Sequence, residues 1–352
     1  MLITIFSLLG VLILLVMAHE CGHFFTARAF GVKVEEFGLF FPPRLWSFTR
    51  KGTRYSINAI PIGGFVKLAG EEDPSVPGSL AGKKPYVRII VLAAGSIMNA
   101  ILPLVLFALA FMIPHNVVKG EVVVQEVATN SPAEEQGIQV EDTILAINGK
   151  TIESLIDVST QINLKLGQEI EMLVEHSDAT RETITVVPRW QPPENEGAVG
   201  IVSSMPDATT VSESFPFWEA IPKGFSECYD TYILYKNGII SLIIGATPAT
   251  VAGPVGIAEL TGEAARAGFS YLLEFAAFFS INLAIINLFP LPALDGGRIV
   301  FVLLEWIRGG KRISARVEGL IHTTGFFLLI AAMLAITYQD IARIIAGESL
   351  IP

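Results

Sequence analysis

The residues with the clearest capacity for chemistry are two histidines and a glutamate near the amino terminus, in the run His19-Glu20-Cys21-Gly22-His23. Residues four apart lie on one face of an α-helix, so both imidazoles can reach one metal ion. Glu20 projects about 100° away from His19 and is placed to take a proton from water instead of binding the metal. Zinc favours neutral imidazole ligands and activates water. The pattern therefore predicts zinc-dependent hydrolysis with Glu20 as the base.

The elements that position these side chains are predicted to be membrane helices. Of the 352 residues, 51% are hydrophobic and only 16% are charged, which is typical of a membrane protein. Four segments are apolar enough to cross a bilayer: residues 2–30, 89–113, 271–289 and 320–336. A cleaved signal peptide is the alternative for the first segment, although a positively charged start is missing. Ionisable groups are costly in hydrocarbon, which favours a functional site over packing for the two histidines.

Charge indicates the partners and the orientation. The net charge of −10 argues against a nucleic-acid partner, which would require a basic surface. Lysine and arginine are concentrated in residues 31–86 and 299–317, which predicts that both connections are cytoplasmic. Both chain ends and the long segment between the second and third spans are then extracytoplasmic. His19 lies roughly 25 Å along the first helix from Leu2, beyond the bilayer centre and toward the cytoplasm.

Catalytic zinc usually has three protein ligands and one open position, so a third ligand is expected. The ionisable groups close to the later spans are Glu274, Asp295, His322 and Asp340. Asp295 follows the third span at the depth of the histidines, whereas Glu274 and Asp340 lie toward the other membrane face. Depth therefore favours Asp295, on a segment where prolines break the helix. His322 is expected to be a simple packing residue. The alternative is that it supports the metal ligands without binding the metal itself.

Residues 117–190 have the character of a soluble domain. Short β-rich runs are expected at 121–127, 143–147, 169–175 and 182–187. Between the first two, Ser131 as a cap, Pro132 in the first turn and Gly137 at the end predict one short helix. This helix and the later pattern Asp142-x-Ile-x-x-Ile-Asn-Gly resemble a bacterial PDZ domain of the permuted type. The following residues are expected to hold a Pro-rich linker and then amphipathic helices over 214–245.

Residues 54–68, RYSINAIPIGGFVKL, alternate in character on either side of Gly63-Gly64, which predicts a β-hairpin centred on the two glycines. An exposed hairpin edge could pair with an unwound substrate and present its extended backbone to the metal. Gly63, Gly64 and Phe65 are therefore candidate substrate-binding residues. The alternative is a hairpin that only plugs the cytoplasmic side. Asn99 in the second span is expected to form a helix–helix hydrogen bond, with a place in the substrate region as the alternative.

Taken together, these features resemble the site-2 protease family of intramembrane zinc proteases over essentially the whole chain. The resemblance rests on HExxH in the first span, the PDZ-like domain after the second, and the pattern N-x-x-P-x-P-x-L-D-G from Asn287 to Gly296. It implies one Zn²⁺ per chain, held by His19, His23 and Asp295, with Glu20 as the base. It also implies that Asn287, Pro290 and Pro292 handle unwound substrate and that the hairpin associates with the membrane.

The predicted fold is a polytopic α-helical membrane protein with four transmembrane helices, an inserted extracytoplasmic PDZ domain of α+β type, and a cytoplasmic membrane-associated β-hairpin. The expected transmembrane helices span residues 1–30, 87–114, 269–298 and 318–340. The expected intervening parts are the cytoplasmic hairpin segment 31–86, the PDZ domain 117–190, the linker with amphipathic helices 191–268, and a cytoplasmic loop 299–317.

The leading functional hypothesis is regulated intramembrane proteolysis, in which a single-spanning membrane protein is cut within its span. The resemblance implies a bacterial cytoplasmic membrane and, as substrates, anti-sigma factors or signal-peptide remnants. Membrane lipid and a peptide carboxyl terminus at the PDZ domain are the other expected partners, and the PDZ domain could also act as a size filter. The alternative is a PDZ-bearing membrane scaffold with a structural zinc, which would not require Glu20 and would normally use four protein ligands. A membrane-anchored protease for soluble peptides would need a downstream glutamate ligand on a helix, and no matching motif is present.

Overall fold

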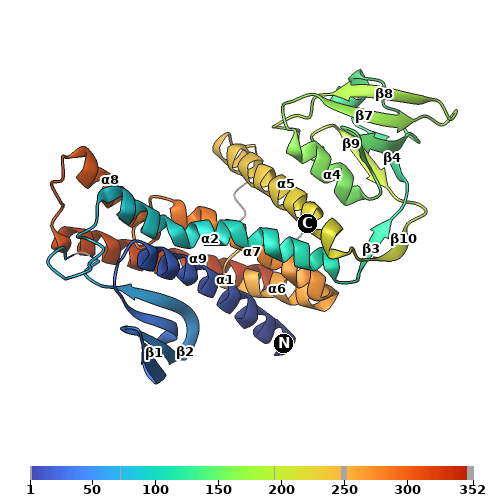
Figure 1. Cartoon of the computed structure of the whole chain (residues 1–352). Coiled ribbons are helices and arrows are strands. Elements are labelled where there is room, and N and C mark those ends of the chain that lie inside the picture. Colours follow the sequence, from blue (N-terminus) through green and yellow to red (C-terminus); the bar gives the residue numbers. More distant parts are fainter. Residues whose placement is uncertain (1, 72, 194, 247–251, 347–352) are drawn as a thin grey trace. The chain divides into compact units, whose positions relative to one another are not determined.

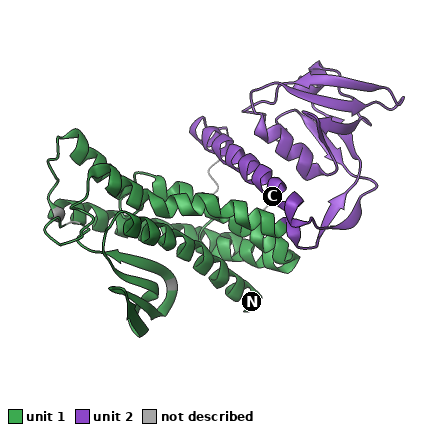
Figure 2. Cartoon of the chain, viewed as in Figure 1, with its two compact units in different colours: residues 1–110, 251–352 green, residues 111–250 purple. Residues whose placement is uncertain are grey.

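The computed structural model describes residues 2–71, 73–193, 195–246 and 252–346, apart from the side chains of residues 62 and 315. The chain divides into two compact units (Figure 2). Unit 1 comprises Met1–Ala110 with Val251–Pro352, and unit 2 comprises Phe111–Thr250. The residues of the HExxH and L-D-G motifs all belong to unit 1. Unit 1 is therefore the part of the chain that positions the candidate site.

Long apolar helices form the framework of unit 1 (Figure 1). Four described helices are long and apolar enough to cross a membrane: α1 (Leu2–Ala29), α2 (Pro85–Met112), α7 (Phe269–Leu288) and α9 (Ala315–Ala346). They coincide with the four predicted spans. The helix α9 extends well beyond the predicted segment 320–336, because charged residues at both of its ends lower the hydropathy there without ending the helix. The prediction of four apolar, membrane-length helices is confirmed.

Two shorter helices complete the helical part of unit 1. The helix α6 (Pro254–Ala267) packs against α1, α7 and α9. Its amino terminus is capped by Asp340 of α9, whose buried carboxylate accepts the N–H of Gly256 at 2.8 Å. The helix α8 (Asp295–Ile307) corrects the prediction of a loop over 299–317, since the chain is helical as far as Ile307. Its inner face buries Val302 and Glu305, and Glu305 pairs with Arg88 of α2 at 2.5 Å.

A β-hairpin packs on α1. The strands β1 (Val34–Arg50) and β2 (Thr53–Leu68) are antiparallel, and the chain turns at Lys51-Gly52, where φ is 50° and 80°. The predicted turn at Gly63-Gly64 is therefore wrong, because both glycines lie inside β2. Residues 36–39 pair both with 64–67 and with 54–57, so the hairpin folds back on itself. The ring of Phe24 in α1 contacts Phe37 and Tyr55, which fixes the hairpin to the helix.

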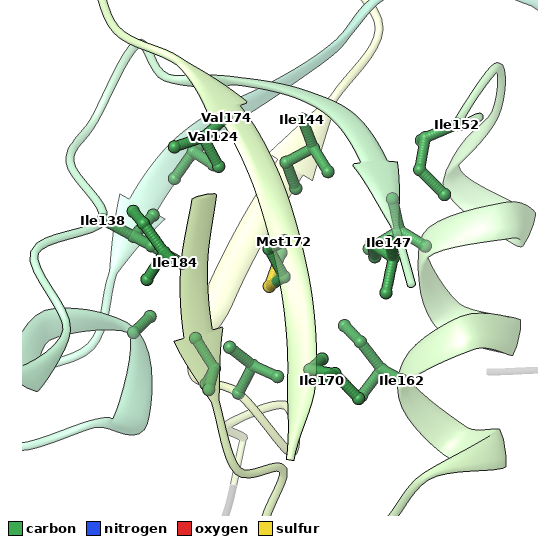
Figure 3. Close-up of a cluster of buried hydrophobic side chains, with 14 of the residues drawn as sticks. Val124, Ile138, Ile144, Ile147, Ile152, Ile162, Ile170, Met172, Val174 and Ile184 are labelled. Carbon is green, nitrogen blue, oxygen red and sulfur yellow. The ribbon is translucent and has the colours of Figure 1, made fainter. Parts of the chain in front are cut away.

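Unit 2 contains an antiparallel sheet with the strand order β8-β7-β5-β4-β9, in which the short strand β6 also pairs with β5. Alternate residues of β7 (Ile170, Met172 and Val174) are buried, as the period of a strand requires. They form the core shown in Figure 3 with Val124, Ile144 and Ile162. The predicted β-rich runs are confirmed as four of these strands. The bounds are β4 (Val122–Val127), β5 (Thr143–Ile147), β6 (Lys150–Thr151), β7 (Ile170–Glu175), β8 (Arg181–Val186) and β9 (Ile201–Ser204).

The helices of unit 2 are α3 (Pro132–Glu135), α4 (Leu155–Leu164) and α5 (Phe217–Ile243). The predicted short helix is confirmed as α3, with the hydroxyl of Ser131 accepting the N–H of Glu134 at 3.2 Å. Two expectations for 191–268 are corrected. The strand β9 returns to the sheet beside β4, and β10 (Thr209–Glu213) pairs with β3 (His115–Lys119), so this stretch is more than a linker. The amphipathic helices expected over 214–245 are one continuous helix, α5.

Candidate metal centre and active site

Three potential metal ligands converge at the junction of α1 and α8. The Nε2 atoms of His19 and His23 lie 3.1 Å apart, and Oδ2 of Asp295 lies 3.0 Å from the first and 3.2 Å from the second. Within the described residues, they form the one group of three or more His, Cys, Asp or Glu side chains close enough to share a metal ion. The structure thus brings together the three residues that the sequence predicted as ligands.

The donor atoms fit zinc in chemistry and in spacing. Zinc binds imidazole nitrogen and carboxylate oxygen at about 2.0–2.1 Å, and the edges of such a tetrahedron are about 3.3 Å long. The observed separations of 3.0–3.2 Å are close to this value. Oδ2 of Asp295 is buried and accepts no hydrogen bond from the described residues, although two imidazoles are adjacent. A buried carboxylate oxygen without a hydrogen-bond donor, beside two imidazole nitrogens, is suited to a cation as its partner.

The backbone of α2 orients His23. Its Nδ1 atom lies 2.8 Å from the carbonyl oxygen of Val91. Because a carbonyl can only accept, Nδ1 carries the proton and Nε2 keeps its lone pair for a metal. Such a hydrogen bond behind a histidine ligand fixes both tautomer and ring direction. Val91 is a site residue that the sequence could not reveal, because its contribution is a backbone carbonyl.

Glycines let α2 approach the two histidines. A Cβ atom added to Gly95 would lie 2.4 Å from Nε2 of His23 and 2.6 Å from Nε2 of His19. A Cβ atom on Gly22 of α1 would lie 2.2 Å from the carbonyl oxygen of Ala94. Both positions therefore require glycine, and the helices touch backbone to backbone beside the candidate ligands. The sequence analysis missed Gly95, since a glycine in an apolar helix carries no sign of what it faces.

The segment between α7 and α8 turns sharply to deliver Asp295. The helix α7 ends at Leu288, as the prolines predicted, and Asp295 is the first residue of α8. The two following glycines are packed against carbonyls of this turn. A Cβ atom would lie 2.1 Å from the oxygen of Phe289 at Gly296 and 2.4 Å from that of Leu291 at Gly297. The Asp-Gly-Gly run is thus a structural requirement of the turn that carries Asp295.

Glu20 faces the hairpin. A Cβ atom added to Gly64 of β2 would lie 3.6 Å from Cγ of Glu20 and 3.3 Å from Cγ1 of Val16. Gly63 has φ of 73° and lies against the ring of Phe41, which stacks on Phe65 at 6.3 Å between centroids. The three hairpin residues predicted to contact substrate therefore lie on the strand segment beside Glu20.

The remaining predicted residues occupy different surroundings. Asn287 is half-buried in the last turn of α7, and Pro290 is exposed in the turn that follows. Pro292 packs on α9, where a Cβ atom added to Gly325 would lie 2.2 Å from the Cβ atom of Pro292. Asn99 is buried one turn beyond Gly95, and its backbone oxygen, not its side chain, accepts the hydroxyl of Ser280 in α7 at 2.8 Å.

Unit 2 has a groove of its own, with a volume of about 530 Å³. The helix α4 contributes Leu155, Val158 and Ile162 to one wall, and Ile201 and Ser203 of β9 lie on the other. In the described sheet β9 is an edge strand, with β4 as its neighbour. An edge strand next to an apolar helix face offers backbone hydrogen bonds and side-chain pockets together, which is the arrangement that binds an extended peptide.

Comparisons with known proteins agree with this geometry. The family described as peptidase family M50 matches residues 7–332. A predicted zinc metalloprotease of Clostridium acetobutylicum is 37% identical over 337 residues, which cover 94% of each chain. The zinc metalloproteases RasP of Oceanobacillus iheyensis and Geobacillus kaustophilus are 29% and 28% identical, with at least 94% of each chain covered. The chain therefore belongs to peptidase family M50, the site-2 protease family, and is a zinc metalloprotease of a bacterial membrane.

Proposed function

We propose that the protein is an intramembrane endopeptidase that hydrolyses peptide bonds within the transmembrane segment of single-pass membrane proteins. In this proposal His19, His23 and Asp295 hold one zinc ion and Glu20 is the general base. The observation that carries it is the position of the two imidazoles, which meet Asp295 from within a helix of membrane length and composition. A metal site on such a helix suits a substrate that is itself in the membrane.

The chain's own residues account for the chemistry. A zinc ion held by the three side chains would supply the Lewis acidity that activates water and polarises a peptide carbonyl. Glu20 projects from the same helix toward β2 and would accept the proton of the attacking water, then donate it to the leaving amine. The hydrogen bond from Nδ1 of His23 to Val91 fixes the direction of that ring and leaves Nε2 as the nitrogen available to the metal.

The hairpin is the proposed binding surface for an unwound substrate. Residues 64–68 pair with 34–39 on one side, and no partner strand lies on the other side among the described residues. A substrate strand added at this edge would run beside Glu20, with its peptide bonds exposed as they are not in a helix. Asn287 and Pro290, at the open end of α7, are proposed to contact the same segment.

We further propose that unit 2 is a PDZ domain. Its groove between β9 and α4 would take a peptide carboxyl terminus, such as that left by an earlier cut, or the domain would exclude substrates that are still too large. The distribution of Lys and Arg supports cytoplasmic placement of the hairpin and of residues 299–317. Unit 2 and both chain ends would then be extracytoplasmic, and anti-sigma factors or signal-peptide remnants would be suitable substrates in regulated proteolysis.

The test compares wild-type protein and Glu20→Gln on a panel of single-pass membrane proteins reconstituted with the enzyme in vesicles. We expect cleavage within the span by the wild type, a decrease of at least about 100-fold in Glu20→Gln, and equal zinc content in both. Asp295→Ala should lose zinc and activity together. Cleavage that survives Glu20→Gln would refute the proposed base. Zinc binding without cleavage of any panel member would favour the membrane scaffold instead.

A further inference from the structure

We propose that His322 of α9 is a positioning residue for Asp295, holding the turn before α8 in the conformation that presents the carboxylate to the two histidines. This inference rests on the zinc assignment proposed above. His322 is in neither the HExxH nor the L-D-G motif, and its sequence position alone favoured simple packing. The contacts it makes across the fold give it a more specific role.

The turn that His322 contacts is strained. Ala293, two residues before Asp295, has φ of 75°, a left-handed conformation that favours glycine over a residue with a Cβ atom. Such a conformation persists only where the surrounding structure holds it. Within the turn, Leu291 donates to the carbonyl of Phe289 at 2.7 Å and Leu294 donates to that of Leu291 at 3.2 Å. Neither bond involves the N–H of Ala293, which points out of the turn.

His322 accepts a hydrogen bond from the N–H of Ala293. The amide of Ala293 donates to Nδ1 of His322 at 2.9 Å. Because an amide can only donate here, Nδ1 is unprotonated in this arrangement. The imidazole is itself held by the ring of Phe301 in α8, at 5.3 Å between centroids. His322 therefore connects the turn to both α9 and α8.

A second contact from α9 supports the first. Gly325, three residues after His322, lies against Pro292, and a Cβ atom there would be 2.2 Å from the Cβ of Pro292. The same face of α9 thus packs against Pro292 and accepts a hydrogen bond from Ala293. Since Leu294 and Asp295 follow directly, a shift of the turn would move Oδ2 of Asp295. Zinc ligands tolerate displacements of only about 0.2 Å, so a small relaxation would weaken the site.

The sharpest test uses two amides of different reach in the full-length protein. His322→Asn places its carbonyl oxygen close to the position of Nδ1 and keeps the acceptor. His322→Gln is equally polar but places its oxygen near the position of Nε2. Zinc affinity is measured by competition with a chromogenic chelator in detergent, and cleavage is measured at limiting and at saturating zinc. We expect the zinc dissociation constant to rise about tenfold in His322→Gln and to stay within about twofold of wild type in His322→Asn.

A suppressor variant adds an independent arm. Ala293→Gly removes the strain, so the turn needs less support from His322. The double variant His322→Gln/Ala293→Gly should therefore bind zinc more tightly than His322→Gln alone. In the single variant His322→Gln, saturating zinc should restore cleavage. Equal zinc affinity in His322→Gln, His322→Asn and wild type would overturn the proposal. Asp295→Ala is the reference: if that variant retains zinc, the zinc assignment fails, and if it loses zinc while both His322 variants match wild type, only the role of His322 fails.

Discussion

Gly95 is the residue of α2 in contact with both proposed histidine ligands, so Gly95→Ala perturbs the centre through a single methyl group. The new Cβ atom would lie 2.4 Å from Nε2 of His23, whereas ordinary contacts begin at 3.4 Å. The imidazole or the helix must therefore move by about 1 Å, several times the displacement of about 0.2 Å that zinc ligands tolerate. The helices cannot separate freely, because Gly22 already contacts the carbonyl of Ala94 and His23 is bonded to Val91.

The two effects of this substitution on stability act in opposite directions and leave a net destabilisation of at most about 2.5 kcal/mol, so zinc affinity is the more informative measurement. Alanine stabilises a helix by about 0.5–1 kcal/mol relative to glycine, and overpacking costs about 1–3 kcal/mol. We expect at most a modest decrease in the thermal unfolding temperature, whereas zinc affinity falls about 100-fold and cleavage falls with it. Gly10→Ala is the matched control, since nothing lies within 4 Å of its added Cβ atom. If Gly95→Ala keeps wild-type zinc affinity and cleavage, the proposed geometry of the ligands is wrong.

Two further predictions concern parts of the chain away from the ligands. Glu305→Ala leaves the guanidinium of Arg88 buried without its carboxylate partner, so we expect about 3 kcal/mol of destabilisation in chemical unfolding, and an unchanged midpoint would contradict the buried pair. In unit 2, hydrogen bonds to Asp142 and then to Glu182 raise the pKa of His176 above its ordinary value of 6.5. The stabilisation by protonated His176 is therefore complete below about pH 6.5 and is lost as the pH rises through the raised pKa of His176. Hydrogen exchange in β7, corrected for its intrinsic pH dependence, should accelerate over that pH range in the wild type. It should not accelerate in His176→Gln.

The three proposed ligands could be identified from the sequence because their signals are local or depend only on depth in the membrane. The spacing of His19 and His23 places them on one helix face without any knowledge of the fold. The prediction of Asp295 also required the depth of the third span relative to the first. The structure places Oδ2 of Asp295 within 3.2 Å of the Nε2 atoms of His19 and His23. What surrounds the ligands was not predictable, because the close approach of Gly95 exists only after α1 and α2 have packed.

The hairpin shows how a local signal can mislead. Adjacent glycines between alternating residues are typical of a hairpin turn, yet the turn is at Lys51-Gly52. Gly63 and Gly64 serve other needs, a positive φ against Phe41 and a close approach to α1. The missed helix α8 has a similar cause. Counting positive charges marked its segment as a loop, whereas its apolar face could have been recognised from the helical period.

The two histidines and Asp295 are held in physically different ways, and this difference has a consequence for the enzyme. The histidines project from one continuous helix that is locked against α2 by glycine contacts, so their positions are fixed once unit 1 has folded. Asp295 instead begins a helix after a strained turn, and α9 holds that turn through Ala293 and Pro292. A movement of α9 would therefore displace the carboxylate while leaving the imidazoles in place. His322→Gln, which removes the support that α9 gives the turn, should accordingly lower zinc affinity without altering the environment of His23, which labelled-histidine NMR of the zinc-free protein can establish.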